Sequence, residues 1–136
     1  MGKRKVVLDT NILISALGWK GKPRQIFRKI LDGKFDLVIS HKQLYELLRV
    51  MNYPNFNFKQ EQKVLFLTII IEVATVVETV GNLRVIEDDH DDNVILESAI
   101  VGNVDFIISG DEHLLKLKKY EKVMIVTAAE FLNLVD

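Results

Sequence analysis

The sequence predicts an α/β fold, in which a single domain has a short central parallel sheet with helices on both faces. Short apolar runs alternate with longer segments of helical periodicity, which is typical of parallel strands joined by crossover helices. The runs are almost wholly apolar, as strands covered on both faces are. A chain of 136 residues fits one domain, and no repeat or linker divides it.

The first elements in order are a strand at residues 5–8 and a short helix at residues 12–17. Asn11 opens that helix as its N-cap in one interpretation, which leaves Asp9 to face a cleft. In the other interpretation Asp9 is the cap. A second helix begins at Pro23, because proline is favoured in a first helical turn, and a later glycine ends it. Its expected apolar face consists of Ile26, Phe27, Ile30 and Leu31.

A strand at residues 35–39 and a longer helix come next. Ser40 and Gln43 have the spacing of a capping box, in which each side chain bonds the other residue's backbone N–H. Apolar residues then recur at helical spacing until a Tyr-Pro-Asn segment breaks the helix. The apolar face of this helix is expected to be Leu44, Leu47, Leu48 and Met51.

Residues 60–77 combine helical and strand-like patterns. The segment starts as a helix, but β-branched residues crowd its second half. We expect a helix to about residue 71 and a short strand at residues 75–77. The helix is apolar around nearly its whole circumference over residues 64–71, which is more than one core-facing stripe requires. It is either buried fully within the monomer or covered, together with the loop at residues 53–58, by another copy or an inhibitor.

The last third of the chain is expected to continue the alternation. A helix at residues 92–101, a strand at residues 105–109 and a helix at residues 112–117 follow one another, with Asp111 as the cap of the last. A strand at residues 123–126 then leads to a closing helix, which a Thr-x-x-Glu capping box opens. The first of these helices is expected to bury Ile95, Leu96, Ala99 and Ile100.

Composition narrows the class of protein. The chain has no cysteine, which excludes disulfides, thiolate metal sites and a cysteine nucleophile. Its N-terminal residues lack the apolar stretch of a signal peptide, and its longest apolar region, residues 64–77, is shorter than the roughly 20 residues that span a bilayer. We therefore expect a cytoplasmic protein that does not enter a membrane.

The net charge of −1 hides an uneven distribution of charge. Basic residues gather at positions 3–5, 20–29 and 116–122, whereas acidic residues gather at positions 87–92. An acidic metal site with basic flanks for phosphates would have this pattern. The expected nucleic-acid contacts are Lys20, Lys22 and Arg24.

Acidic residues follow the apolar runs at four places. Asp9 and Asp111 come directly after strands, Glu46 lies in the helix after a strand, and residues 87–92 follow a Val-Ile pair. Taken singly, each acid has a structural explanation as a helix cap or a surface charge. Ligands of open α/β sheets bind beyond the carboxyl ends of the strands, so these acids are expected to meet at one edge. Because clustered carboxylates repel without a cation, the pattern indicates Mg²⁺ or Mn²⁺ and chemistry on phosphate.

These segments resemble the motifs of PIN-domain ribonucleases. Residues 7–13 resemble the opening motif, Glu46 is similar to the second acid, residues 89–99 match the third-acid region, and residues 104–111 resemble the closing motif. The order and spacing match essentially the whole chain, residues 1–136. The chain looks most like the stand-alone prokaryotic branch, whose members are described as toxins of toxin–antitoxin pairs.

The resemblance implies an endoribonuclease that cuts single-stranded RNA with one or two Mg²⁺ or Mn²⁺ ions. Within residues 87–92 we prefer Asp92 as the ligand, because it stands at the helix start, and Asp89 second. His90 departs from the family, in which proline often stands there. Asn11 and Ser109 would orient the acids or a metal-bound water. The acids that the resemblance assigns to both metal binding and catalysis are Asp9, Glu46, Asp92 and Asp111.

The resemblance also implies an antitoxin protein and a second copy of the chain as partners. Two other functions compete with the nuclease. A non-catalytic RNA- or protein-binding module with the same fold is disfavoured because all four acids are present. An aspartyl phosphotransfer or phosphatase domain would use Asp9 as nucleophile, but such sites usually have a second acid where Asn11 stands and a lysine where Asp111 stands.

The histidines and aromatic residues give weaker signals. His41, His90 and His113 lack the spacing of zinc ligands and are expected to have surface or structural roles. Trp19 either stacks on a base or packs under a loop, and residues 56–58 present the same two alternatives.

Overall fold

The computed structural model describes residues 2–86 and 90–135. Within them, one six-stranded sheet has the order β3-β2-β1-β4-β6-β5. Neighbouring strands are parallel from β3 to β6, and β5 alone is antiparallel to its neighbour. The strands are β1 (Lys5–Leu8), β2 (Asp36–Ser40), β3 (Thr75–Val77), β4 (Phe106–Ile108), β5 (Lys119–Tyr120) and β6 (Val123–Val126). The helices are α1 (Thr10–Gly18), α2 (Lys22–Leu31), α3 (His41–Met51), α4 (Gln60–Val73), α5 (His90–Val101), α6 (Glu112–Leu115) and α7 (Ala128–Val135).

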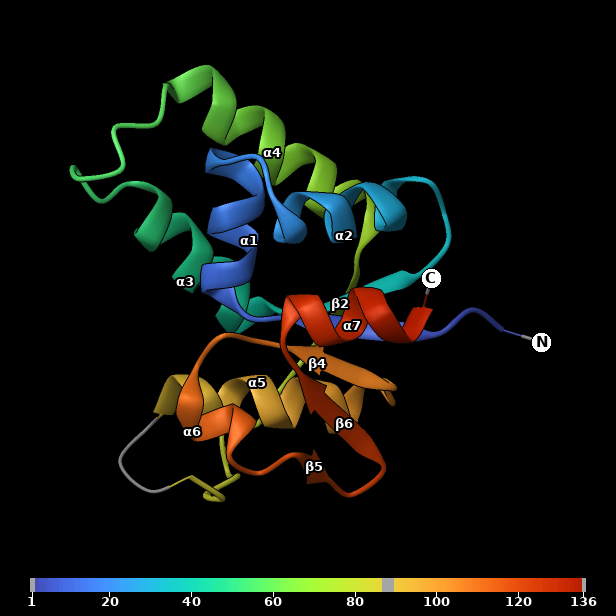
Figure 1. The fold of residues 1–136 in the computed structure, drawn as a ribbon. Helices are drawn as coiled ribbons and strands as arrows, with labels where there is room; N and C mark the ends of the chain where they lie inside the picture. The colour runs from blue at the N-terminus through green and yellow to red at the C-terminus, as the bar shows by residue number, and fades with distance from the viewer. Residues whose placement is uncertain (1, 87–89, 136) are drawn as a thin grey trace.

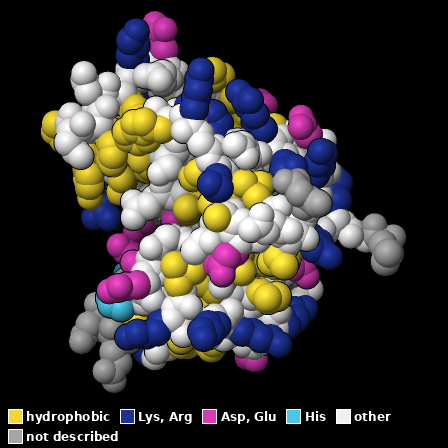
Figure 2. Space-filling model, in the orientation of Figure 1, with side chains coloured by type: hydrophobic (Ala, Val, Ile, Leu, Met, Phe, Trp, Pro, Cys, Tyr) yellow, Lys and Arg dark blue, Asp and Glu magenta, His cyan; other side chains and the backbone are white. Residues whose placement is uncertain are grey.

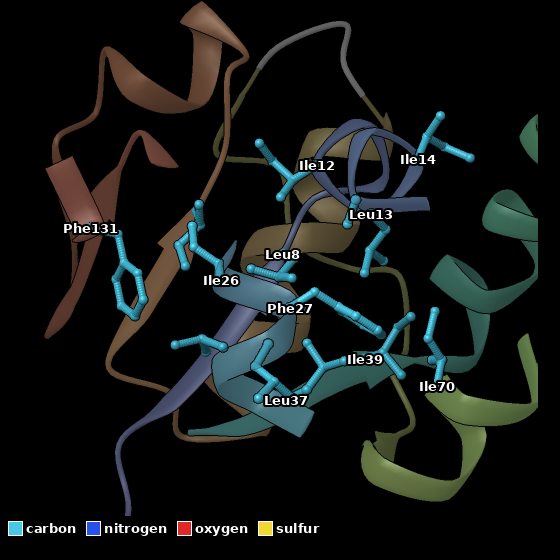
Figure 3. Packing of buried hydrophobic residues seen from close by; sticks show 14 of the residues in the cluster. Leu8, Ile12, Leu13, Ile14, Ile26, Phe27, Leu37, Ile39, Ile70 and Phe131 are labelled. Atoms are coloured by element: carbon cyan, nitrogen blue, oxygen red, sulfur yellow. The ribbon is translucent and has the colours of Figure 1, made fainter. Parts of the chain in front are cut away.

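Helices cover both faces of the sheet, as the sequence predicted. Figure 1 shows α1, α2, α3, α4 and α7 on one face and α5 and α6 on the other. Alternate strand residues supply the two cores: Val6 and Leu8 pack with the larger group of helices, whereas Val7 packs with α5. Figure 3 shows the larger core, where side chains of β1 and β2 meet those of α1, α2, α4 and α7. The predicted α/β class is confirmed.

Three local features differ from what the sequence indicates. The antiparallel edge strand β5 was not expected, and α6 ends at Leu115 rather than at residue 117. The Val-Ile pair at residues 85–86 is not a strand. Its two backbone N–H groups each donate to the Oδ1 of Asn93, at 2.9 Å, so the pair is fastened to α5 rather than to a neighbouring strand.

Some residues placed on apolar faces are largely exposed. Leu31, Leu48 and Ile100 keep 44%, 43% and 40% of their surface accessible, although the helical pattern predicted them to be buried. A helix buries one stripe, and these residues lie beside it. None of the helices in the described parts of the chain is long and apolar enough to cross a membrane.

Helix α4 exposes much of its apolar surface. Phe66 and Ile70 are buried against the core, but Val64, Leu65 and Ile71 are more than half exposed. Burial of the whole segment within the monomer, one of the two explanations from the sequence, is therefore wrong. Trp19 is also half exposed and makes edge contacts with the rings of Phe56 and Phe58.

Candidate active site

The predicted acids converge on a cleft at the carboxyl edge of the sheet. The cleft has a volume of about 240 Å³, and residues of α1, α3 and α5 line it together with the segment after β4. Figure 2 shows acidic side chains gathered where α1 and α3 approach α6, with a histidine beside them. The acids that line the cleft are Asp9, Glu46, Asp91, Asp92 and Asp111.

Asp9 lies at the end of β1 and is both a helix cap and a cleft residue. Its Oδ1 accepts a hydrogen bond of 2.9 Å from the backbone N–H of Ile12, so Asp9 is the N-cap of α1. Its Oδ2 accepts a hydrogen bond from the hydroxyl of Ser109. Asn11, the alternative cap, is instead an exposed residue of the first helical turn that lines the cleft.

Ser109 connects two of the acids. Its hydroxyl donates to Asp9 and accepts a hydrogen bond of 2.9 Å from the backbone N–H of Asp111. Ser109 is fully buried at the end of β4. Asp111 in turn caps α6, because its Oδ1 accepts from the backbone N–H of His113 at 2.8 Å. This chain of hydrogen bonds fixes both carboxylates relative to the sheet edge.

Three side chains come close enough to share a cation. Ligand atoms of Asp92, Asp111 and His113 all lie within 4.8 Å of one another. Two carboxylates fit a hard divalent cation such as Mg²⁺ or Mn²⁺, and the imidazole extends the choice toward transition metals. The donor set therefore fits a divalent cation. The sequence did not single out His113 as a ligand; its signal was the Asp-x-His spacing at the start of a helix.

Glu46 lies on α3 and is half-buried beside α1. The hydroxyl of Thr10 donates to its Oε1. Burial and the neighbouring carboxylate of Asp91 raise the pKa of Glu46 to about 7, although Thr10 and Arg49 act in the opposite direction. Near neutral pH this side chain therefore both takes up and releases a proton. Thr10 and Arg49 are two cleft residues that the sequence did not identify.

Asp9 also resists ionisation. Burial raises the pKa of Asp9, and the charge of Asp111 adds to the effect, whereas the hydrogen bonds from Ser109 and Ile12 oppose it. Burial is the main cause of the raised pKa of both Asp9 and Glu46, and a neighbouring carboxylate adds to each. A cation would offset the repulsion between these carboxylates.

The predicted basic contacts do not line the cleft. The guanidinium of Arg24 donates to the carbonyls of Ala16 and Leu17, at 2.9 and 2.8 Å, and so caps the C-terminal end of α1. Lys20 and Arg24 line a separate cavity of about 260 Å³. Asp89, the second choice for the third acid, lies outside the residues that the structure describes.

Comparisons with known proteins agree with this arrangement. The family model described as the PIN domain matches residues 5–113. This chain belongs to the PIN-domain family. It is 31% identical, over 132 residues, to an uncharacterised protein of Methanocaldococcus jannaschii, and the match covers 90% of this chain and 80% of the relative.

Two solved structures share the fold. VapBC2 from Rickettsia felis, bound to a DNA fragment from its promoter, is similar with a TM-score of 0.63 and 19% identity, over 89% of this chain and 96% of that one. PAE2754 from Pyrobaculum aerophilum is similar with a TM-score of 0.61 and 14% identity, over 96% of this chain and 89% of that one. The resemblance to PIN domains seen in the sequence is confirmed, and family membership supports a nuclease-like role.

An aspartyl phosphotransfer site finds no support in this PIN domain. No lysine within residues 2–86 and 90–135 lines the acidic cleft; its basic residue is Arg49.

Proposed function

We propose that this PIN-domain protein, with residues 1–136 as one nuclease domain, is a divalent-metal-dependent endoribonuclease that hydrolyses single-stranded RNA. The observation that carries the proposal is the convergence of Asp92, Asp111 and His113 within 4.8 Å, beside Asp9 in the same cleft. Family membership supports a nuclease-like role. We propose one or two Mg²⁺ or Mn²⁺ ions as the metal and single-stranded RNA as the substrate.

The acids would bind the ion, and neighbouring residues would fix the positions of the acids. Asp9, Asp92 and Asp111 offer carboxylate oxygens at the sheet edge, and Glu46 faces them from α3. When bound, such an ion polarises the scissile phosphate and neutralises its charge. Ser109 is a positioning residue, because its hydroxyl holds Asp9 and the backbone of Asp111 together. The ligand set that we propose is Asp9, Glu46, Asp92 and Asp111, extended by His113.

Glu46 is suited to proton transfer. A general base works best when its pKa lies near the working pH, and in the metal-free protein the pKa of Glu46 is raised to about 7. The hydroxyl of Thr10 fixes Oε1, which orients the carboxylate in the cleft. We assign Glu46 the role of accepting the proton that an attacking water loses.

We also propose that this protein is a cytoplasmic toxin, that it pairs with an antitoxin protein and that it forms a homodimer. The shared fold with VapBC2, whose structure includes promoter DNA, supports the toxin assignment. The exposed apolar residues Val64, Leu65 and Ile71 of α4 support an interface with another protein. The toxin assignment is tested by the growth of cells that express the chain with or without the adjacent reading frame. If growth is not arrested in either case, the assignment is contradicted.

The reaction is tested with a labelled single-stranded RNA. Purified protein should cleave it internally with Mg²⁺ or Mn²⁺ and should stop when EDTA is added. The same sequence as duplex RNA and as single-stranded DNA tests the substrate class. Equal cleavage in EDTA would overturn the metal dependence, and cleavage of DNA in preference to RNA would overturn the substrate.

A further inference from the structure

A second cavity opens directly beside the acidic cleft. It lies between α3 and α5 and has a volume of about 290 Å³. The two cavities share four lining residues, Glu46, Arg49, Asp91 and Ile95, so they adjoin each other. A substrate whose phosphate lay at the acids would therefore place a neighbouring group in the second cavity.

The lining of the second cavity is suited to a base and its phosphate. Val94 and Ile95 give it an apolar wall. Lys42 and Arg49 supply positive charge, and Tyr45 is 73% exposed. An exposed aromatic ring next to basic side chains is the combination that holds stacked bases of single-stranded nucleic acids. Glu46 and Asp91 line both cavities, whereas Asp9, Asp92 and Asp111 line only the acidic cleft.

Gln43 adds a hydrogen-bond acceptor to this lining. Its Nε2 donates to the carbonyl of Leu8 at 2.6 Å, which fixes the orientation of the amide. Its Oε1 is buried and has no hydrogen-bond partner among the described residues. A buried polar group without a partner is costly, so a donor brought by a ligand would be bound favourably. The edges of nucleobases carry such N–H donors.

We propose that the second cavity is a base-binding subsite, which holds one of the two nucleotides that flank the scissile phosphate. Tyr45 stacks on the base, Lys42 and Arg49 neutralise the adjoining phosphate, and Gln43 accepts a base N–H. The subsite rests on the proposed ribonuclease function, since it assigns the scissile phosphate to the acids. The base that fits the cavity between α3 and α5 would then influence where the RNA is cut.

The subsite is tested by moving one abasic nucleotide along a labelled RNA and measuring kcat/KM for each substrate. The loss of kcat/KM should be largest when the abasic nucleotide lies at one particular position next to the cut. Tyr45→Ala should lower kcat/KM on intact RNA roughly tenfold, mainly through KM. It should have little further effect when the abasic nucleotide occupies the subsite. Leu48→Ala is the matched control, because Leu48 is an exposed residue of the same helix outside the cavity.

A binding measurement separates the subsite from the reaction. Asp9→Asn protein, in Mg²⁺, is titrated into RNA that contains 2-aminopurine, and stacking on Tyr45 should quench its fluorescence. Quenching that Tyr45→Ala removes and Leu48→Ala retains supports the subsite, even if the wild-type protein cuts no RNA and the proposed function fails. Equal behaviour of the two variants in both assays would overturn the subsite.

Discussion

Ser109 donates a hydrogen bond from its hydroxyl to Oδ2 of Asp9, and the two residues lie 100 positions apart in the chain. The bond joins the end of β4 to the end of β1, which are paired strands. The same hydroxyl accepts from the backbone N–H of Asp111. One buried side chain thus sets the positions of two proposed metal ligands.

Removal of this hydroxyl should impair both stability and catalysis. Ser109→Ala removes a hydrogen bond from a buried carboxylate and leaves the backbone N–H of Asp111 without that partner, which should cost about 1–3 kcal/mol of unfolding free energy. The pKa of Asp9 should rise further, because the Ser109 hydrogen bond lowers it. Urea unfolding and RNA cleavage measure the two effects. Ser98→Ala is the control, since Ser98 is equally buried but bonds only a helix carbonyl, Ile95 O; a loss of cleavage as large in this variant would contradict the assigned role of Ser109.

Asp9→Asn separates the charge of Asp9 from its role as a cap. Asparagine retains an oxygen for the N–H of Ile12 and is itself a good N-cap, so the metal-free variant should stay within about 1 kcal/mol of the wild type or exceed it. Cleavage should be abolished. Mn²⁺ at a hundredfold excess over its dissociation constant should stabilise the wild type by about 2.7 kcal/mol and the variant by less. Melting curves with and without Mn²⁺ measure this, and an unchanged metal shift with a sharply lower metal-free Tm would make Asp9 a structural cap only.

The metal-free protein should lose stability as pH rises from 4.5 toward 7. The pKa of Glu46 is raised from 4.5 to about 7 in the folded protein, so over this interval the folded state binds more protons than the unfolded state. The raised pKa of Asp9 acts in the same direction. Unfolding free energies in urea across this pH range should fall, and Glu46→Gln should make the fall shallower. Glu61→Gln, at the exposed start of α4, should keep the wild-type slope; a slope unaffected by Glu46→Gln would exclude Glu46 as its source.

The exposed face of α4 is expected to mediate self-association. Leu65 is 61% exposed there, and a charge at its position should break an apolar interface. Light scattering at tens of micromolar should show a dimer for the wild type and a monomer for Leu65→Glu. Met124→Glu, on the exposed side of β6, should remain a dimer. A wild-type protein that is monomeric in this range would argue against the homodimer.

The sequence predicted the edge of the sheet where the acids meet, because strand ends and acidic residues are both local signals. Asp9 and Asp111 follow directly from that pattern. The choice between Asp9 and Asn11 as cap could not be made locally, since both residue types cap helices well. In the structure Asp9 is the cap, and its other carboxylate oxygen accepts a hydrogen bond from Ser109, which is distant in sequence.

Tertiary contacts also account for the predictions that failed. Ser40 caps α3 as expected, but the Gln43 side chain bonds the carbonyl of Leu8 instead of completing the capping box. Asn93 occupies the backbone N–H groups of the Val-Ile pair that looked strand-like. The Asp-x-His spacing places His113 near Asp111, but the proximity of both to Asp92 of α5 appears only in the folded chain. In each case a tertiary contact overrides the local pattern.

In the proposed function, Asp92 and Asp111 hold a divalent metal ion that takes part in RNA cleavage. The most direct measurement is the Mn²⁺-dependent cleavage rate of a single-stranded RNA by wild type, Asp111→Asn and the exposed control Asp32→Asn at the end of α2. We predict that Asp111→Asn removes the Mn²⁺-stimulated rate while Asp32→Asn keeps it. A wild-type-like Mn²⁺ response in Asp111→Asn would contradict the assignment of Asp111 as a metal ligand.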